Sequence, residues 1–300
     1  MGDLGLKDLD IYSNKIGLFF NNKEYLSSSF GLSLTFLYFL LSLILFLYYT
    51  IEVINKKQLK IYNSIRYPTD VPSVNLDEHL FYFAFGAEDP KNTSNYIDET
   101  IYYPRVIYYD SIRENNEWRA ETKFYLELER CNISKFSKEH RKLFKNNTLS
   151  NSYCVKNFTN TKLAGGYSYN KISYLKVLLY PCKNTTENNF HCKPQDIIDK
   201  YLSGSYISFQ MQDIGISPTD YKNPTLPIVQ DLFTSFGKSF FKDSAIFYKI
   251  IELEDDIGLF YKNIATKKYI KFERQHDFFY MRNEYEFYAS DNPVCRVTIR

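Results

Sequence analysis

FGLSLTFLYFLLSLILFLYYTI, from Phe30 to Ile51, is a run of twenty-two residues without a charge, and it decides how the chain is organised. At about 1.5 Å per residue, a helix of this length crosses a hydrocarbon core of about 30 Å. The run starts too late and is too long for a cleaved signal, and it lacks a small-residue cleavage site, so we expect an uncleaved signal-anchor. The sequence therefore predicts an N-terminal tail (1–29), a transmembrane helix (30–51), a juxtamembrane stalk (52–77) and an ectodomain (78–300).

Charge and composition narrow the range of partners. The chain has 37 basic and 35 acidic residues, for a net charge of +2, and the two signs are interspersed. Without a basic stripe to meet a phosphate backbone, nucleic acid is not an expected partner. The expected partners are the lipid bilayer and another membrane protein or a second copy of the chain.

One face of the apolar helix carries most of its small or polar residues. Gly31, Thr35, Tyr38 and Ser42 are spaced alternately four and three apart, and Leu45 and Tyr49 continue the series. Such a stripe lets a second helix approach closely, so it predicts association within the membrane. Chance alignment, with Tyr49 as an interfacial anchor, is the alternative.

All cysteines follow the apolar run, and four lie within about sixty residues: Cys131, Cys154, Cys182 and Cys192, with Cys295 left over. This clustering favours disulfides in an oxidising compartment over buried thiols in a cytosolic domain. Four cysteines allow three pairings, and the sequence does not separate them.

The orientation of the chain rests on two signals that disagree. Five N-glycosylation acceptors follow the apolar run: Asn92, Asn132, Asn146, Asn157 and Asn184. Together with the cysteines they predict an extracellular or lumenal C-terminal domain and a cytoplasmic tail. The basic flank favours the reverse orientation. Only three lysines precede the run, whereas four cations follow it within fifteen residues, namely Lys56, Lys57, Lys60 and Arg66.

The region after the stalk is predicted to be mainly antiparallel β with few short helices. Alternating, aromatic-rich segments predict strands at His79 to Phe85, Thr100 to Asp110, Trp118 to Arg130, Lys171 to Tyr180, Ser205 to Ile216, Ala245 to Leu253, Leu259 to Ile264, Lys268 to Glu273 and Phe278 to Tyr288. Glu114 to Asn116 predicts a hairpin turn, and so do residues 255–258. A helix is expected between Pro194 and Gly204. The polar stretch from Cys131 to Asn170 is interpreted as a surface insertion.

The common catalytic and cofactor motifs are missing from the sequence. Gly237-Lys238-Ser239 lacks the glycine that a phosphate loop needs five positions earlier, where Leu232 stands. We therefore expect no enzyme activity, no cofactor and no metal. Weaker alternatives are a metal site at Cys182, His191 and Cys192, acidic cation sites at residues 77–79 and 252–256, and a carboxylate pair at Glu127 and Glu129. Trp118 is expected at a core edge rather than on a ligand platform.

Short segments carry a family resemblance that covers most of the chain. They are Leu9 to Gly17, Tyr25 to Gly31, Asp213 to Pro218 and Asn223-Pro224. With the overall layout, they resemble a large group of uncharacterised transmembrane proteins of ciliated protozoa. The resemblance implies a second membrane helix after the ectodomain, which this sequence does not reach, and it implies no catalytic residue. The topology is also loosely similar to two-helix channels and to two-helix cargo receptors.

These observations predict a membrane-anchored glycoprotein whose ectodomain binds other proteins and whose helix mediates assembly. The alternative is a channel or receptor subunit whose second helix lies beyond Arg300. The stretch from Val294 to Arg300 is interpreted as a strand, so a natural terminus and a longer protein are both open.

Overall fold

The structure is a computed structural model that describes residues 14–20, 23–26, 29–55, 62–76, 81–91, 94–144, 149–184, 191–217, 224–256, 258, 261–281 and 292–300. The chain divides into two compact units, Met1–Asn63 and Ser64–Arg300. The second unit contains most of the strands.

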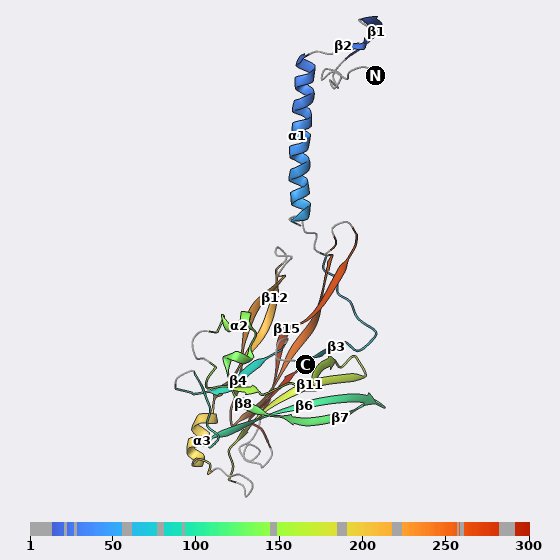
Figure 1. Ribbon diagram of the computed structural model, residues 1–300. Helices are drawn as coiled ribbons and strands as arrows, with labels where there is room; N and C mark the ends of the chain where they lie inside the picture. Colours follow the sequence, from blue (N-terminus) through green and yellow to red (C-terminus); the bar gives the residue numbers. More distant parts are fainter. Residues whose placement is uncertain are drawn as a thin grey trace. The chain divides into compact units, whose positions relative to one another are not determined.

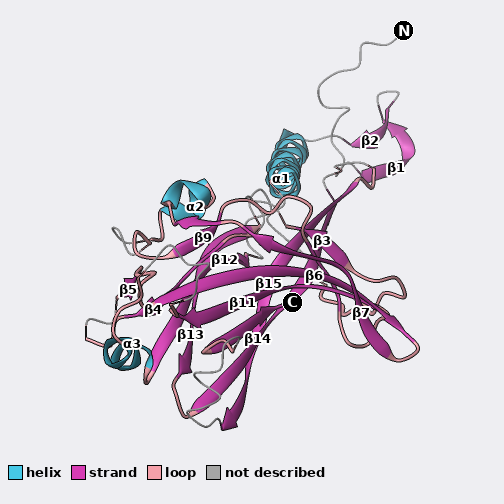
Figure 2. Cartoon of the chain, turned by 90° about the horizontal axis from the view of Figure 1, so that it is seen from below, coloured by secondary structure: helices cyan, strands magenta, loops and turns pink. Residues whose placement is uncertain are grey.

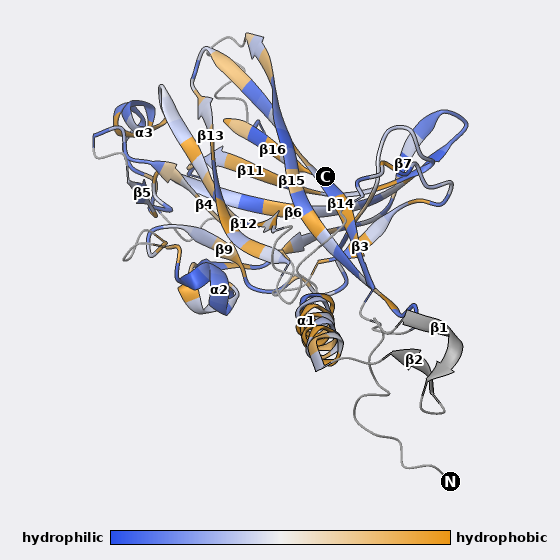
Figure 3. Ribbon diagram, turned by 90° about the horizontal axis from the view of Figure 1, so that it is seen from above, coloured by the Kyte–Doolittle hydropathy of each residue, from blue (hydrophilic) through white to orange (hydrophobic). Residues whose placement is uncertain are grey.

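The first unit consists of a small hairpin and one long helix (Figure 1). Strands β1 (Asn14–Phe20) and β2 (Lys23–Leu26) pair antiparallel, and α1 spans Ser29–Ile54. At 26 residues, α1 is a few residues longer than the predicted span and about 39 Å long. It is hydrophobic along its length (Figure 3), and it is long and apolar enough to cross a membrane, a property that a signal sequence shares.

The second unit is built mainly of strands, with short helices at its periphery (Figure 2). Its larger sheet has eight strands: β3 (Ser73–Asn75), β6 (Tyr102–Glu114), β7 (Glu117–Leu126), β10 (Lys162–Gly165), β11 (Lys171–Pro181), β14 (Phe240–Asp256), β15 (Ile264–Met281) and β16 (Cys295–Ile299). The order β7-β6-β11-β16-β14-β15 forms the main path, and β10 and β3 extend from β11 beside β16. All described pairs in this sheet are antiparallel except β14 with β16.

The smaller sheet has six strands: β4 (Phe83–Glu88), β5 (Asn95–Tyr96), β8 (Leu128–Arg130), β9 (Tyr153–Val155), β12 (Ser205–Ile216) and β13 (Thr225–Phe236). The path is β13-β12-β4-β9-β8, and β5 also pairs with β4. The short helices are η2 (Ile133–Lys135), α2 (Lys138–Arg141) and α3 (Gln195–Leu202).

The two sheets share one hydrophobic core. Alternate residues of β11, namely Leu175, Val177 and Leu179, are fully buried, and aromatic side chains of the smaller sheet meet them in the same cluster. Phe85 stacks on Phe209 with ring centroids 5.7 Å apart. Aromatic pairs add about 0.5–1.5 kcal/mol each to the burial of their area, so this core draws on the high aromatic content of the chain.

Polar contacts also join the sheets. The Thr234 and Ser244 hydroxyls lie 2.6 Å apart, and Ser244 donates to Asp277 at 2.7 Å. The Asp213 carboxylate accepts from the backbone N–H of Phe272 at 2.9 Å. These pairs satisfy buried polar groups that would otherwise destabilise the interface between the sheets.

Several predicted elements are confirmed. The Glu114–Glu117 hairpin is present, and Asn115 and Asn116 adopt positive φ angles of 50° and 67°, as a two-residue hairpin turn requires. β12 has the predicted bounds, and α3 begins after Pro194 and ends before Gly204, whose φ is +75°.

Other predicted elements were wrong in their boundaries. The predicted strand from Trp118 to Arg130 is two strands in different sheets, because the chain crosses from β7 to β8 at Glu127. The two strands predicted at Lys268 to Glu273 and Phe278 to Tyr288 belong, as far as they are described, to the single long β15. β13 was not predicted.

The stalk and the polar insertion also need correction. Residues 73–75 form β3 and pair with β10, so the end of the predicted stalk belongs to the larger sheet. The stretch from Cys131 to Asn170 supplies core residues rather than only surface: Phe136, Leu149, Tyr153, Val155, Phe158 and Leu163. Helix α2 within it is capped by Ser137, whose side chain accepts from the His140 N–H.

Candidate functional site: the outer face of the larger sheet

The side of the larger sheet that points away from the core carries aromatic and charged side chains. Because successive residues of a strand point to opposite faces, alternate positions of five neighbouring strands gather there. We call this set the outer face: Tyr103, Arg105, Tyr109 and Ser111 of β6; Lys123 and Tyr125 of β7; Ile172, Tyr174, Lys176, Leu178 and Tyr180 of β11; Phe241, Asp243, Ala245 and Phe247 of β14; and Arg296, Thr298 and Arg300 in and after β16.

Tyrosine rings on the outer face pair across β6 and β11. Tyr109 is opposite Tyr174 and Tyr103 is opposite Tyr180 in the register. The ring centroids lie 5.2 Å and 5.5 Å apart, and the ring planes are nearly parallel, at 14° and 13°. The two rings of each pair therefore cover each other.

Cations lie against these rings. Lys176 Nζ is 4.8 Å from the Tyr109 centroid, and Arg105 Cζ is 5.3 Å from both Tyr103 and Tyr180. Contacts of this kind hold a cation at a sheet surface by its attraction to the ring quadrupole.

Most outer-face cations lack a carboxylate partner. Within the part of the chain that the structure describes, no ion pair is formed by Arg105, Lys123, Lys176 or Arg300. Many lysines elsewhere are paired, as Lys156 is with Glu127 at 2.8 Å. The outer face is thus a local concentration of uncompensated positive charge on a chain of net charge +2.

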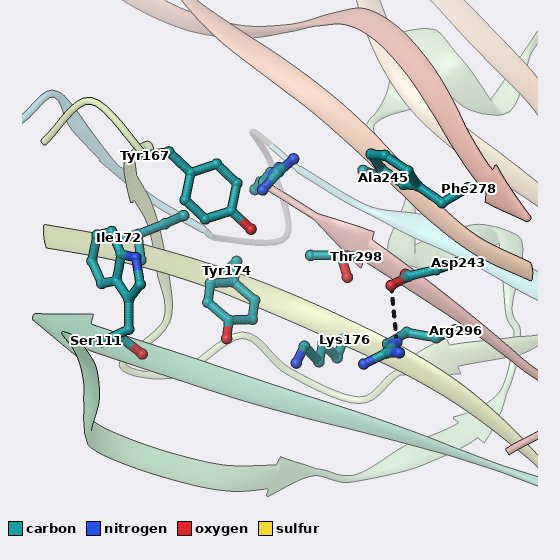
Figure 4. A pocket seen from close by; sticks show the side chains of 12 residues that line it. Ser111, Tyr167, Ile172, Tyr174, Lys176, Asp243, Ala245, Phe278, Arg296 and Thr298 are labelled. Atoms are coloured by element: carbon teal, nitrogen blue, oxygen red, sulfur yellow. Dashed lines mark ion pairs between the residues drawn. The ribbon is translucent and has the colours of Figure 1, made fainter. Parts of the chain in front are cut away.

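Two hollows lie side by side on the outer face and share Lys176 and Arg296 in their walls. The first has a volume of about 280 Å³ and is lined in part by Trp118 and Tyr167, whose rings meet edge to face at 6.2 Å. The second has a volume of about 530 Å³. In Figure 4, Tyr174, Lys176 and Arg296 all extend into the first hollow, and Asp243 pairs with Arg296 at 3.2 Å.

The electrostatics of the hollows favour an incoming anion. Burial lowers the pKa of the Lys176 ammonium, and the neighbouring Arg296 lowers it further. Burial raises the pKa of the Asp243 carboxyl, although Arg296 and Lys176 oppose that change. An added negative charge would stabilise the charged form of Lys176. It would also interact with Arg296, which is paired with Asp243.

The disulfides resolve the pairing that the sequence left open. Cys131 bonds to Cys154, and Cys182 bonds to Cys192, with Cα separations of 4.8 Å and 5.6 Å. The second bond uses both thiols of the alternative metal site with His191, so that alternative is wrong. Cys295 is buried in β16 and takes part in neither disulfide.

The predicted glycosylation acceptors are exposed wherever the structure describes them. Asn132, Asn157 and Asn184 lie at the surface, whereas Asn92 and Asn146 fall outside the described residues. The Asn132 side-chain oxygen accepts from the Ser134 N–H, and that of Asn184 accepts from the Cys192 N–H, both at 2.9 Å. Each bond uses the amide oxygen and leaves the nitrogen that would carry a glycan.

On the predicted helix-association face, Gly31 and Thr35 are buried, whereas Tyr38 and Ser42 are exposed. The Thr35 hydroxyl donates to the Gly31 carbonyl at 3.0 Å. The stripe is therefore divided into a covered N-terminal half and an open half.

The weaker alternatives find structural explanations. Glu127 and Glu129 pair with different lysines, Lys156 and Lys135, so they do not act as a carboxylate pair. Glu252 pairs with Lys268 across the β14–β15 hairpin, and Glu254 pairs with Arg66 of the segment that precedes β3. Residues 77–79 lie outside the described residues.

Three further residues have local roles. Lys238, in the loop between β13 and β14, pairs with Asp199. His140 is buried, and its Nε2 lies 2.7 Å from the Asp213 carbonyl. Trp118 lines a hollow on the outer face, so the expectation of a core edge was wrong.

Residues 84–300 match a family described as the N-terminal domain of an uncharacterised 80 kDa protein. The chain belongs to this family. No curated protein and no solved structure matches it. The family description names no activity.

The sequence analysis missed the central residues of the outer face. Lys176 and Tyr174 alternate with buried residues in Lys171–Pro181, and Arg296 and Arg300 do the same around β16. Alternation of aromatic or basic residues with aliphatic ones was the available signal. It becomes a site only because β11 and β16 are neighbours, which the sequence does not reveal.

Proposed function

We propose that this protein is a membrane-anchored glycoprotein that binds other proteins through the outer face and carries out no catalysis. The observation that carries the proposal is the group of cations without carboxylate partners, held against aromatic rings on a rigid sheet. Aromatic residues and arginine are enriched where proteins bind one another, and a broad open face suits a macromolecule better than a small substrate.

The anchor in this proposal is α1, and the β domain is extracellular or lumenal. Two disulfides support an oxidising compartment, and three exposed glycosylation acceptors agree with it. The basic residues after the helix favour the opposite orientation. The open half of the helix stripe, with Tyr38 and Ser42, is the proposed surface for assembly in the membrane.

Orientation is tested on the full chain expressed in eukaryotic cells. We expect the protein to stay in membranes after alkaline extraction and to shift in mobility after glycosidase treatment. Replacing Asn132, Asn157 and Asn184 by Gln should remove the part of the shift that these sites produce. An unshifted protein whose β domain is cleaved by protease added to the cytosolic side contradicts the proposed orientation.

Binding is tested by photo-crosslinking in the same cells. A photoreactive amino acid replaces Tyr125, which is 58% exposed on the outer face, or Tyr206, which is 49% exposed on β12 of the smaller sheet. We expect covalent adducts with another protein at position 125 and not at position 206. Equal labelling at both positions, or none at 125, contradicts binding through the outer face.

A further inference from the structure

The cations of the outer face lie on adjacent strands. Lys123 of β7, Arg105 of β6, Lys176 of β11 and Arg296 of β16 lie on successive members of the sheet. With neighbouring strands about 4.8 Å apart, these four strands spread positive charge across about 14 Å. A single small anion would contact only part of this span, whereas a chain with repeated negative charges could meet all of it.

The register places the two arginines on either side of an apolar residue. Arg105 and Arg296 both face Leu178, one from each neighbouring strand. Asp243 lies on the other side of Arg296, and it is the only carboxylate among the described residues that line the two hollows. Guanidinium groups match the planar geometry of a carboxylate and can bind it through two parallel hydrogen bonds.

Apolar side chains lie between the charges. Ile172 and Ala245 line the first hollow, and Leu178, Phe241 and Met281 line the second. This mixture of cationic and apolar contacts is complementary to a peptide that carries both acidic and apolar side chains.

The ring geometry disfavours an acidic carbohydrate. A sugar ring stacks on the open face of an aromatic ring, but the tyrosine pairs Tyr103–Tyr180 and Tyr109–Tyr174 cover each other's faces. Lys176 and Arg105 occupy positions over these rings as well. Peptide carboxylates need only the cations and no open ring face.

We propose that the outer face binds an acidic segment of a partner protein, with carboxylates on Arg105, Lys176 and Arg296 and apolar side chains in the two hollows that adjoin Lys176 and Arg296. This inference rests on the proposed function and specifies the chemistry of the partner.

The test measures fluorescence anisotropy of a labelled peptide of Glu-Leu-Glu-Ser repeats with the purified full chain in neutral detergent. Matched peptides carry Gln or Lys in place of Glu. We expect saturable binding of the Glu peptide and no binding of the Gln or Lys peptide. Binding should weaken as the salt concentration rises, because salt screens exposed charges over about 8–10 Å.

Two charge reversals locate the site. The first pair, Lys176→Glu with Arg296→Glu, reverses the charge at the centre of the outer face. The second pair, Arg105→Glu with Lys123→Glu, changes exposed positions and should leave the fold intact. Each pair of substitutions should lower the affinity for the Glu peptide at least about tenfold, and the second pair should raise the affinity for the Lys peptide. The matched control, Lys138→Glu with Lys200→Glu, changes exposed lysines of α2 and α3 and should bind as the original protein does.

The outcomes separate this inference from the proposed function. Absence of Glu-peptide binding, or binding that the exposed reversal leaves unchanged, overturns the acidic-segment inference. Binding of a sulfated polysaccharide through the same residues without binding of the peptide overturns it in favour of a glycan. In either case, adducts at position 125 in the crosslinking experiment still support protein binding through the outer face.

Discussion

Replacing the cysteines of the Cys131–Cys154 disulfide by alanine tests how the β domain is stabilised. The bond joins the residue after β8 to β9 across a sequence separation of 23 residues. In the chain-entropy model, closing a loop of this size stabilises the fold by about 3.4 kcal/mol, whereas the separation of 10 residues between Cys182 and Cys192 gives about 2.7 kcal/mol. The pairing further predicts non-additivity within each disulfide, because the first substitution already breaks the bond.

The assay is urea denaturation of the full chain in detergent, followed by tyrosine fluorescence. C131A alone should lower the free energy of unfolding by about 3 kcal/mol, and C154A should then add only its packing loss of about 1 kcal/mol. C131A with C182A should instead show additive losses, because two bonds are broken. Additivity for Cys131 with Cys154, or strong coupling of Cys131 with Cys182, would refute the pairing.

Three further predictions concern the core, the pH dependence and the helix. Phe85→Ala should lower the free energy of unfolding by about 3–5 kcal/mol in urea denaturation, because Phe85 is fully buried. Burial would raise the pKa of Asp98, but hydrogen bonds from Lys193 and Thr100 outweigh it and lower that pKa. The resulting stability is present above the unfolded-state pKa near 3.8 and is lost as pH falls through the lower folded-state pKa. Lys193→Met should therefore reduce this acid-dependent loss of stability, as measured by denaturation between about pH 5 and 2. Ser42→Leu should reduce chemical crosslinking between helices in membranes, because leucine prevents close approach.

Each of these predictions has a matched control. Tyr261 is 88% exposed, so Tyr261→Ala should change the free energy of unfolding by less than about 0.5 kcal/mol. Lys200→Met removes a lysine that is not paired with Asp98 and should leave the acid-dependent loss as it is. Ser33→Leu alters the opposite side of α1 and should preserve crosslinking. A control that behaves like its test variant contradicts the corresponding assignment.

The strands with regular alternation were predictable from the sequence, and those with irregular patterns were not. β12 alternates along its length, and its bounds were predicted correctly. β13 was missed because Pro224 and Pro227 indicate a turn. It is nevertheless a strand because it lies at the edge of the smaller sheet, where the missing N–H of a proline can face away from the ladder.

Long-range packing explains the errors between β7 and β10. The stretch from Cys131 to Asn170 is polar on average, so its composition indicates a surface. Two of its core residues, Phe136 and Phe158, lie outside its strands and helices, and the Cys131–Cys154 disulfide and turns position them instead. Likewise, nothing local at Glu127 indicates that the chain leaves one sheet for the other.

Packing of β16 fixes the position of the outer-face cations. The strand pairs antiparallel with β11 and parallel with β14, and its inward residues Cys295, Val297 and Ile299 are buried in the core. A slip of one residue would bring these three to the outer face and force Arg296 and Thr298 into the core. The apolar residues of the strand therefore oppose every register that is shifted by an odd number of residues. The same burial that stabilises the fold thus keeps Arg296 on the outer face, where it lies between Leu178 and Asp243.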